Sequence, residues 1–558
     1  MGRYNLLDEK WIEVISLADG NQTEVSLLEV FSDAANIKCL AGEMKTQNFA
    51  LLRFLIAIIQ TVFSRLDCSG EPYSYIRLDQ RLAQIGEVEE DDREDYAYEL
   101  RDNWKKIWEL RHFPDIICIY LEKWRDHFNL YDDKYPFYQL TEEEMHHIKP
   151  DIIKPNFCGK NLNRLISESG NKTALFSPLE EDCKDIMTSG ELFRWLIMLQ
   201  GYMGLQDKAE YKGENQKASR GWLYDIGGLY LRGDNLFETL MMNYIPVHPE
   251  ERYQCRPERP CWEITGLDNV SRLRNGEPID NLSQLYTNWS RAVSMDMNRG
   301  EDAPVALKVV KLPKILHEDN FLEPMTVWKK NKDGHYIPMM HSPDKAMWRS
   351  FGLITLRSDG KDQHQPAITG HLDDIRGVCG SRWISICAVS MRDDGKPASQ
   401  CLADEIIDEL SANDLVIADT SDRGWIVRIS DTVQITKEVA YIYQRFLENV
   451  SKIRGQDPKG KGQAKAKAKK FIDSESERFY QKLNEPFYGW LAGIHPEDAK
   501  NDKVAEWYST LERLALQQAD SIVDMATTRD FIGSKKEDFN IINANEIFRH
   551  QVLKKLEG

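Results

Sequence analysis

Glycines and lysines between Gly455 and Lys470 form the motif most suggestive of chemistry in this sequence. The segment GQDPKGK, which starts at Gly455, matches the GxxxxGK pattern of phosphate-binding loops, in which backbone amides hold phosphates. However, Gly462 follows where a magnesium-binding Ser or Thr belongs. Helical patterns also flank the segment, whereas a phosphate-binding loop follows a buried strand. The sequence therefore disfavours nucleotide binding here.

The same segment is better described as a lysine run without acids. It lies in Pro458–Lys470 and contains Lys459, Lys461, Lys465, Lys467, Lys469 and Lys470. Clustered lysines attract phosphates, because each neutralised phosphate releases counterions. Two interpretations stay open: a solvated linker between helices, or a surface that binds the backbone of a nucleic-acid strand.

A second basic patch consists of Lys308, Lys311 and Lys314, with no Asp or Glu between Ala303 and Leu316. On a continuous strand, Lys308 and Lys314 would share one face and Lys311 the other. If Pro313 ends the strand, Lys314 lies in a loop. The alternative is an exposed strand whose lysines serve only solubility.

Residues for metal chemistry are few. His364, His371 and Asp373, followed by Asp374, lie close together in a loop-like stretch, but without the spacing of a known metal hydrolase motif. A metal-dependent nuclease of a defence system is the alternative function that they allow. The ten cysteines contain no CxxC pair, so we expect no zinc site, no other metal and no cofactor.

The charge balance seems at first to exclude a nucleic-acid partner. The 558 residues include 72 Lys and Arg and 90 Asp and Glu, a net charge of -18, whereas nucleic-acid-binding domains are usually basic. A whole-chain sum does not exclude local basic patches. The most apolar segment, Phe49–Phe63, contains Arg53 and Gln60, so we expect a buried helix and not a membrane span. With no secretory signal, the sequence predicts a cytoplasmic protein.

The elements that position these residues change in character along the chain. Helical patterns cover Gln47–Arg65 and Tyr96–Leu121, and long polar loops cover Ser177–Thr188 and Gly204–Gly221. The region from Trp262 to Ser430 is rich in strand patterns. Its strand candidates are Val305–Leu312, Thr326–Lys330, Trp383–Met391, Leu415–Thr420 and Trp425–Ser430.

The C-terminal region has the periodicity of amphipathic helices. Four segments after residue 430 each carry one apolar stripe at a 3–4 spacing, which predicts an antiparallel four-helix bundle. We therefore predict an α+β protein. A large mixed α/β domain covers residues 1–430, and the four-helix bundle covers residues 431–558.

Several motifs, taken together and in order, resemble the CasA family, the large subunit of the type I-E CRISPR effector complex (Cascade). The resemblance runs from residue 4 to about residue 495. It rests on YNLLDEKWIEV at the start, YPFYQL at Tyr135–Leu140, RGDNLFETLMMN at Arg232–Asn243, EPMTVWKK at Glu323–Lys330, HSPDKAMWRSFG at His341–Gly352 and SESERFYQ at Ser474–Gln481.

The resemblance implies a role without catalysis. Such a subunit recognises the protospacer-adjacent motif (PAM) in double-stranded DNA and promotes duplex opening and R-loop formation. It stabilises the displaced strand and recruits the helicase–nuclease. Guide pairing reads the rest of the target, so few base contacts suffice. The implied partners are the other Cascade subunits with crRNA, double-stranded target DNA and the helicase–nuclease, with no membrane.

Motif positions in the family assign roles to particular residues. The glycine-rich loop falls within Gly204–Gly221, and the lysine finger is Lys311 or Lys314. The wedge is the hairpin Arg392–Ser399, with Lys396 at the tip where the family has a glutamine. The residues implied to contact the PAM are therefore Lys311, Lys314, Gly213, Asn215, Asp394, Gly395, Lys396 and Pro397. The lysine run is assigned to the displaced strand, and Phe176 and Ser177 to a loop that docks at the RNA-bound end of the complex.

Overall fold

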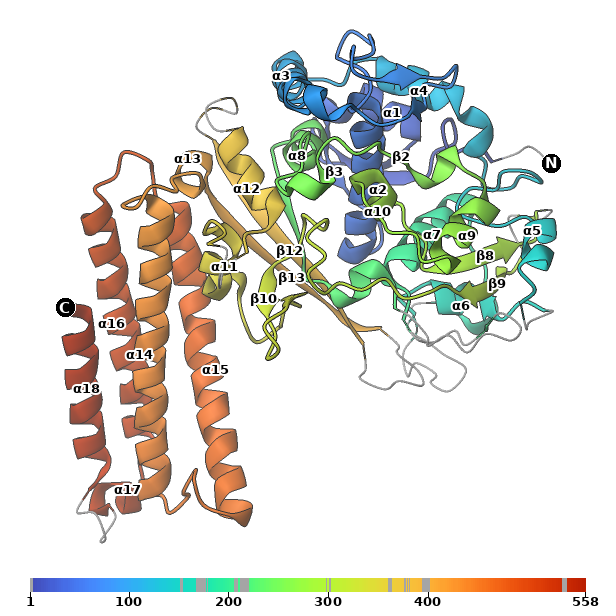
Figure 1. Cartoon of the computed structure of the whole chain (residues 1–558). Coiled ribbons are helices and arrows are strands. Elements are labelled where there is room, and N and C mark those ends of the chain that lie inside the picture. Colours follow the sequence, from blue (N-terminus) through green and yellow to red (C-terminus); the bar gives the residue numbers. More distant parts are fainter. Residues whose placement is uncertain are drawn as a thin grey trace. The chain divides into compact units, whose positions relative to one another are not determined.

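The chain forms two compact units (Figure 1). The computed structural model describes residues 4–150, 154–166, 177, 179–204, 209–210, 220–297, 299–300, 303–359, 364–375, 378, 380, 382–393, 402–533 and 539–557. Unit 1 comprises residues 1–341, 366–379 and 386–408. Unit 2 comprises residues 342–365, 380–385 and 409–558.

The core of unit 1 is built around one helix, α2 (Lys45–Phe63). Helices from distant parts of the sequence pack against it. They are α4 (Ile116–Lys123), α7 (Ser189–Tyr202), α8 (Leu236–Asn243) and α10 (Leu282–Tyr286). Within the described part of the chain, α2 alone has the length and apolar composition to cross a membrane, and it is entirely buried. The expected buried helix is confirmed.

The described residues form three small sheets and two short hairpins. The first sheet has the order β2-β1-β3 (Gln22–Val25, Ile12–Ser16, Ile37–Leu40), and the second has the order β6-β9-β8 (Phe157–Cys158, Ala306–Lys311, Arg291–Met295). The third has the order β13-β12-β7 (Leu402–Asn413, Trp383–Asp393, Gly228–Arg232). The hairpins are β4-β5 (Arg77–Leu78, Gln84–Ile85) and β10-β11 (Trp328–Lys330, Tyr336–Pro338).

Shorter helices complete unit 1 and lead into unit 2. They are α1 (Leu27–Ser32), α3 (Arg93–Leu110), α5 (Glu142–His147), α6 (Gly159–Leu162), α9 (Gly266–Arg274), α11 (Phe351–Thr355), α12 (Ala367–Asp374) and α13 (Asp414–Ile417). At the start of α8, the Asn235 side chain accepts a hydrogen bond from the Glu238 amide, as its capping spacing predicts.

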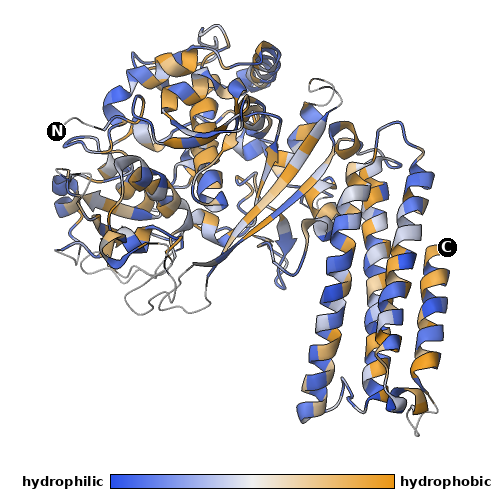
Figure 2. Ribbon diagram, turned by 180° about the vertical axis from the view of Figure 1, so that it is seen from behind, coloured by the Kyte–Doolittle hydropathy of each residue, from blue (hydrophilic) through white to orange (hydrophobic). Residues whose placement is uncertain are grey.

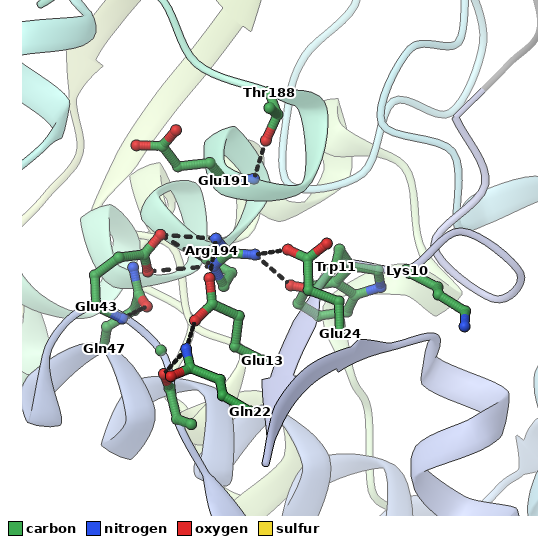
Figure 3. A network of polar contacts seen from close by, with 12 residues as sticks. Lys10, Trp11, Glu13, Gln22, Glu24, Glu43, Gln47, Thr188, Glu191 and Arg194 are labelled. Carbon is green, nitrogen blue, oxygen red and sulfur yellow. Dashed lines mark hydrogen bonds and ion pairs between the residues drawn. The ribbon is translucent and has the colours of Figure 1, made fainter. Parts of the chain in front are cut away.

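A buried arginine joins the first sheet to α7 (Figure 3). The Arg194 guanidinium binds the carboxylates of Glu13 at 2.8 Å, Glu24 at 3.0 Å and Glu43 at 2.8 Å, and it donates to the carbonyl oxygen of Trp11 at 2.7 Å. Because one planar cation serves β1, β2 and the segment before α2, this network holds the N-terminal sheet in place.

Unit 2 contains the four long helices that the sequence predicts, which lie side by side in Figure 1. They are α14 (Trp425–Ile453), α15 (Gly462–Ala492), α16 (Lys500–Asp524) and α18 (Ile541–Glu557), with the short α17 (Thr528–Ile532) before α18. Figure 2 shows apolar and polar residues alternating along them. Tyr443, Phe479 and Phe548 meet in the bundle interior. The α+β fold class with its helical C-terminal region is confirmed.

Two predicted strands are helical. The first half of the segment Leu415–Thr420 lies in α13, and Trp425–Ser430 forms the start of α14. Short apolar runs do not distinguish a strand from a buried helix, and here the capping residues decide. The Asn413 side chain accepts from the Leu415 amide at 3.0 Å, and Asp419 accepts from the Trp425 amide at 2.9 Å.

Candidate nucleic-acid interface

Lys311 lies at the end of strand β9 and is buried, with 4 % of its surface exposed. Its ammonium donates to Oε1 of Glu210 at 2.6 Å, and its backbone amide donates to the carbonyl of Ala209 at 3.2 Å. Lys308, earlier on the same strand, forms an ion pair with Glu142. These two lysines therefore have carboxylate partners within the protein.

Lys314 differs from both, because its side chain is exposed. The strand ends at Lys311, Leu312 is fully buried, and Pro313 turns the chain into the loop that carries Lys314. Lys314 and Arg252 line an open groove of about 550 Å³, whose wall also contains four carboxylates, those of Glu277, Asp280, Glu318 and Asp319. Of Lys311 and Lys314, only Lys314 presents its ammonium group to solvent.

The loop after Lys314 is anchored by His317. The His317 ring stacks on Trp222, with 4.1 Å between ring centroids, and its Nε2 lies 2.9 Å from the Trp222 carbonyl oxygen. Because a carbonyl oxygen only accepts, Nε2 carries the proton and donates. Burial lowers the pKa of His317, which favours this neutral ring at physiological pH.

A buried ion pair fixes the far end of the same loop. Arg53 of α2 donates two hydrogen bonds to Glu323, at 2.7 and 2.8 Å, and Trp222 donates its indole N–H to Glu323 at 2.6 Å. Burial would raise the pKa of Glu323, but the charge and hydrogen bonds of Arg53 lower it overall. The carboxylate of the EPMT motif is therefore a positioning group that ties the Lys314 loop to the core helix.

The predicted wedge hairpin is anchored at its base by the segment that follows Gly221. Asp393 is the last residue of β12, and it accepts a hydrogen bond from the Tyr224 hydroxyl. Arg220 pairs with Asp225 at 2.8 Å, and its guanidinium lies 4.9 Å from the centre of the Tyr224 ring. Burial raises the pKa of Tyr224, so the phenol stays protonated and donates.

The structure thus brings the bases of three predicted elements together. The Gly204–Gly221 loop is bound to strand β9 through Glu210, and to the end of β12, where the predicted wedge hairpin starts, through the segment that begins at Arg220. The close approach at the end of this loop requires glycine, because a Cβ on Gly221 would lie 2.3 Å from the carbonyl oxygen of Gly201. Three segments far apart in sequence form one platform.

Some sequence-assigned residues lie outside the described part of the chain. They are Gly213 and Asn215 of the glycine-rich loop, Asp394, Gly395, Lys396 and Pro397 of the hairpin tip, and Phe176 of the docking loop. Ser177 is described and half-buried, and its hydroxyl accepts from the Leu179 amide at 3.3 Å. The roles given to these residues stay predictions.

The lysine run is more ordered than a linker. Helix α15 begins at Gly462, so Lys465, Lys467, Lys469 and Lys470 lie in its first turns. All six lysines of the run are exposed. Lys465 and Lys469 are four residues apart on the helix, and like charges at this spacing lower the stability of α15 slightly. The interpretation as a plain interhelical linker is wrong for these four residues.

The residues of the alternative nuclease do not form a metal site in the described structure. His371 belongs to helix α12, not to a loop, and its buried ring packs edge-on against Trp104 at 5.6 Å. Burial lowers the pKa of His364 to about 4. Among the described residues, no three His, Cys, Asp or Glu side chains are grouped as metal ligands would be.

Sequence reasoning missed the residues that hold the platform together. Trp222, Tyr224 and Arg53 carry its contacts, and Trp222 and Tyr224 lie outside the motifs on which the resemblance rests. The sequence does contain one indication of Trp222 and Tyr224: the apolar segment GWLYD directly follows a long polar loop. An arginine in the middle of the most apolar helix also predicts a buried carboxylate partner.

A family model described as CRISPR-associated protein Cse1 matches residues 5–518 of the chain. The chain belongs to this Cse1 family. A Cse1 relative, CRISPR-associated protein CasA/Cse1 of Thermus thermophilus, is 24 % identical over 385 residues. That match covers 67 % of this chain and spans 65 % of the relative's length. The resemblance drawn from the sequence motifs is thereby confirmed.

Solved Cse1 structures share the fold. Thermobifida fusca Cse1 aligns with a TM-score of 0.76 and 21 % identity, covering 100 % of this chain and 98 % of that one. Cse1 from Acidimicrobium ferrooxidans aligns with a TM-score of 0.70 and 18 % identity, covering 100 % and 99 %. A chain of a CRISPR RNA-guided surveillance complex aligns with a TM-score of 0.69 and 14 % identity, covering 99 % and 100 %.

Proposed function

We propose that this Cse1-family chain is the large, non-enzymatic subunit of a cytoplasmic CRISPR RNA-guided surveillance complex. In that role it recognises the PAM in double-stranded DNA, promotes duplex opening and R-loop formation, stabilises the displaced strand and recruits the helicase–nuclease. Family membership supports the placement in such a complex, and the structural likeness to a chain of a surveillance complex agrees with it.

The exposed ammonium of Lys314 on a doubly anchored loop is the observation that carries the DNA-reading part of the proposal. Buried Leu312 fixes one side of the loop, and the His317–Trp222 stack fixes the other. A lysine held this way donates to acceptors on base edges without first ordering its own backbone. Minor-groove acceptors are nearly alike for A·T and T·A pairs, so one lysine there tolerates several related PAMs.

The acidic body fits this role within an assembly. A net charge of -18 weakens nonspecific binding to bulk DNA, because the surface as a whole repels phosphates. The partner subunits and crRNA then hold the guide and the target strand, and this chain adds local contacts. We expect weak DNA binding by the isolated chain.

The test is a Lys314→Ala variant in the complex assembled with its partner subunits and crRNA. Binding to a PAM-bearing duplex is compared with binding to the same target without the PAM. We expect roughly a tenfold loss on the PAM-bearing duplex, since one good base contact contributes about 1–3 kcal/mol of discrimination. The matched control is Lys105→Ala, which removes an exposed lysine on α3. Equal loss in both variants, or none in Lys314→Ala, would overturn the lysine-finger assignment.

A further inference from the structure

Unit 2 contains a cluster of cations outside the lysine run. Arg349 lies in the short helical turn Met347–Ser350, Lys345 precedes it, and Lys437 lies on α14. The guanidinium of Arg349 lies 3.5 Å from the centre of the Tyr480 ring on α15. Burial lowers the pKa of Lys437, and the nearby charges of Lys345 and Arg349 lower it further. Helix α14 packs against the turn Met347–Ser350, so Lys437 and Arg349 lie on neighbouring elements.

Two of these cations, Arg349 and Lys437, have no carboxylate partner among the residues that the structure describes, although the protein has 90 acidic residues. The Nε of Arg349 is buried and has no acceptor, and one turn before Tyr480 the buried hydroxyl of Ser476 also has no partner. Buried donors without acceptors are rare in native proteins, and each calls for an explanation such as an absent ligand.

The cluster cannot easily rearrange to relieve this repulsion. Trp348, next to Arg349, stacks on Phe487 with 4.4 Å between ring centroids. Its indole N–H donates to Oδ1 of Asn484 at 2.9 Å. Arg349 itself donates one guanidinium N–H to the backbone carbonyl of Asp344 at 3.1 Å. The remaining N–H groups of the Arg349 guanidinium are thus held in a fixed position against the Tyr480 ring.

We propose that Lys345, Arg349 and Lys437 bind a backbone phosphate of a single nucleic-acid strand, with Tyr480 offering an aromatic surface beside it. This inference rests on the proposed function, because it supplies that strand with a second contact on unit 2. A guanidinium matches phosphate geometry with two parallel hydrogen bonds, and flanking lysines add charge without further orientation. Aromatic rings next to such cations are typical of single-strand binding.

The position of Tyr480 on α15 favours a strand over a free phosphate ion. Tyr480 follows Lys469 by eleven residues, about three helical turns, so the two lie on the same side of the helix roughly 16 Å apart. A strand bound along this side spans both the lysine run and the cation cluster. Asp473 lies between them on the same side, and its carboxylate limits how strongly the strand is held there.

The decisive variant is Lys437→Met in the full-length chain. If Lys437 serves only the fold, the variant changes in stability but binds a fluorescent single-stranded oligodeoxynucleotide as the wild type does. If Lys437 binds phosphate, the variant loses affinity for this oligodeoxynucleotide, although the removal of like charges raises its thermal stability. We expect a loss of about three- to tenfold and a salt dependence reduced by roughly 0.7 per lost phosphate contact. Arg349→Lys, which keeps the charge but not the planar fork, should weaken binding as well.

The matched control is Lys482→Ala. Lys482 is exposed on the same helix, two residues beyond Tyr480 and therefore on nearly the opposite side. Equal affinity of Lys437→Met and the control would overturn the proposal. Inorganic phosphate could instead raise the thermal stability of the wild type but not of Lys437→Met, while both bind the oligonucleotide equally. That result would show that the cluster binds a phosphate ion and not a strand. Preference for the PAM-bearing duplex depends on Lys314 and should be the same in wild type and Lys437→Met. The proposed role of Lys314 and the proposed phosphate site at Lys437 can therefore fail independently.

Discussion

Tyr224 donates its hydroxyl hydrogen to Asp393, and this bond adds a side-chain link between the end of the glycine-rich loop and the base of the β12–β13 hairpin, beside the pairing of β7 with β12. The two residues are 169 positions apart in the chain. Arg220 packs on the same tyrosine ring, so the last residue before Gly221 also contacts this link.

We predict that Tyr224→Phe uncouples these two elements. The change removes one hydrogen bond to a charged acceptor, and we expect the free energy of unfolding to fall by roughly 1–2 kcal/mol. PAM-dependent binding by the assembled complex should fall by a larger factor than binding to a target whose PAM-proximal pairs are already open. Tyr98→Phe is the control, because Tyr98 is 71 % exposed on α3. Equal losses on closed and open targets would contradict the coupling.

The Arg53–Glu323 pair should contribute strongly to stability when one partner is removed. Glu323→Gln leaves a buried guanidinium without its counter-charge, and we expect a loss of about 3–5 kcal/mol in the free energy of urea unfolding. The double variant Arg53→Met with Glu323→Leu should recover most of that loss, because neither charge is then buried. The pKa of Glu323 is lowered, so the pair's contribution is present above about pH 4.5 and is lost as pH falls through the folded-state value. A double variant as unstable as the single one would contradict this account.

Glu258 should make stability fall as pH rises toward neutrality. Burial raises the pKa of Glu258 to about 7, while hydrogen bonds from the Ser283 amide and from Gln60 oppose the shift. Between about pH 4.5 and pH 7 the folded state holds a proton that the unfolded state releases, so this stabilisation is greatest at low pH and is lost through that window.

Glu258→Gln tests this pH dependence. It should remove a decline of roughly 2–4 kcal/mol between pH 4.5 and pH 8, as measured by urea unfolding across that range. The exposed carboxyl of Glu90 supplies the control variant Glu90→Gln, whose pH profile should match wild type. Parallel profiles for wild type and Glu258→Gln would show that the carboxyl does not titrate in this window.

Replacing the helical lysines of the run should separate binding from stability. A variant with Ala at Lys465, Lys467, Lys469 and Lys470 removes four cations from the N-terminal turns of α15. We expect the bundle to gain about 0.2–0.5 kcal/mol in the free energy of unfolding, because the like charges of Lys465 and Lys469, one turn apart on the helix, are removed. Affinity for single-stranded DNA should fall, with a shallower salt dependence. Lys554→Ala, in the last turn of α18, is the control and should leave DNA affinity unchanged. A destabilised bundle would contradict the charge-repulsion argument.

The periodicity of the sequence was sufficient for the helices of unit 2 and for α2, because an apolar stripe at helical spacing is a local property of the chain. It failed at Leu415–Thr420 and Trp425–Ser430, where short apolar runs fit both a strand and a helix and the caps Asn413 and Asp419 decide. The motif resemblance assigned the family correctly, since ordered motifs along the chain need no contact information.

The sequence by itself determined the family, the fold class and the location of two lysine-rich segments. Only the tertiary structure decided which lysine is accessible. Lys311 and Lys314 are equivalent as residue types, but Glu210 neutralises the first from across the loop and leaves the second in solvent. The same holds for the cations around Tyr480 of α15, which come from the segment Lys345–Arg349 and from α14. The reason is physical: charge at a surface depends on which side chains meet in space, and such meetings between distant segments leave no periodic pattern in the chain.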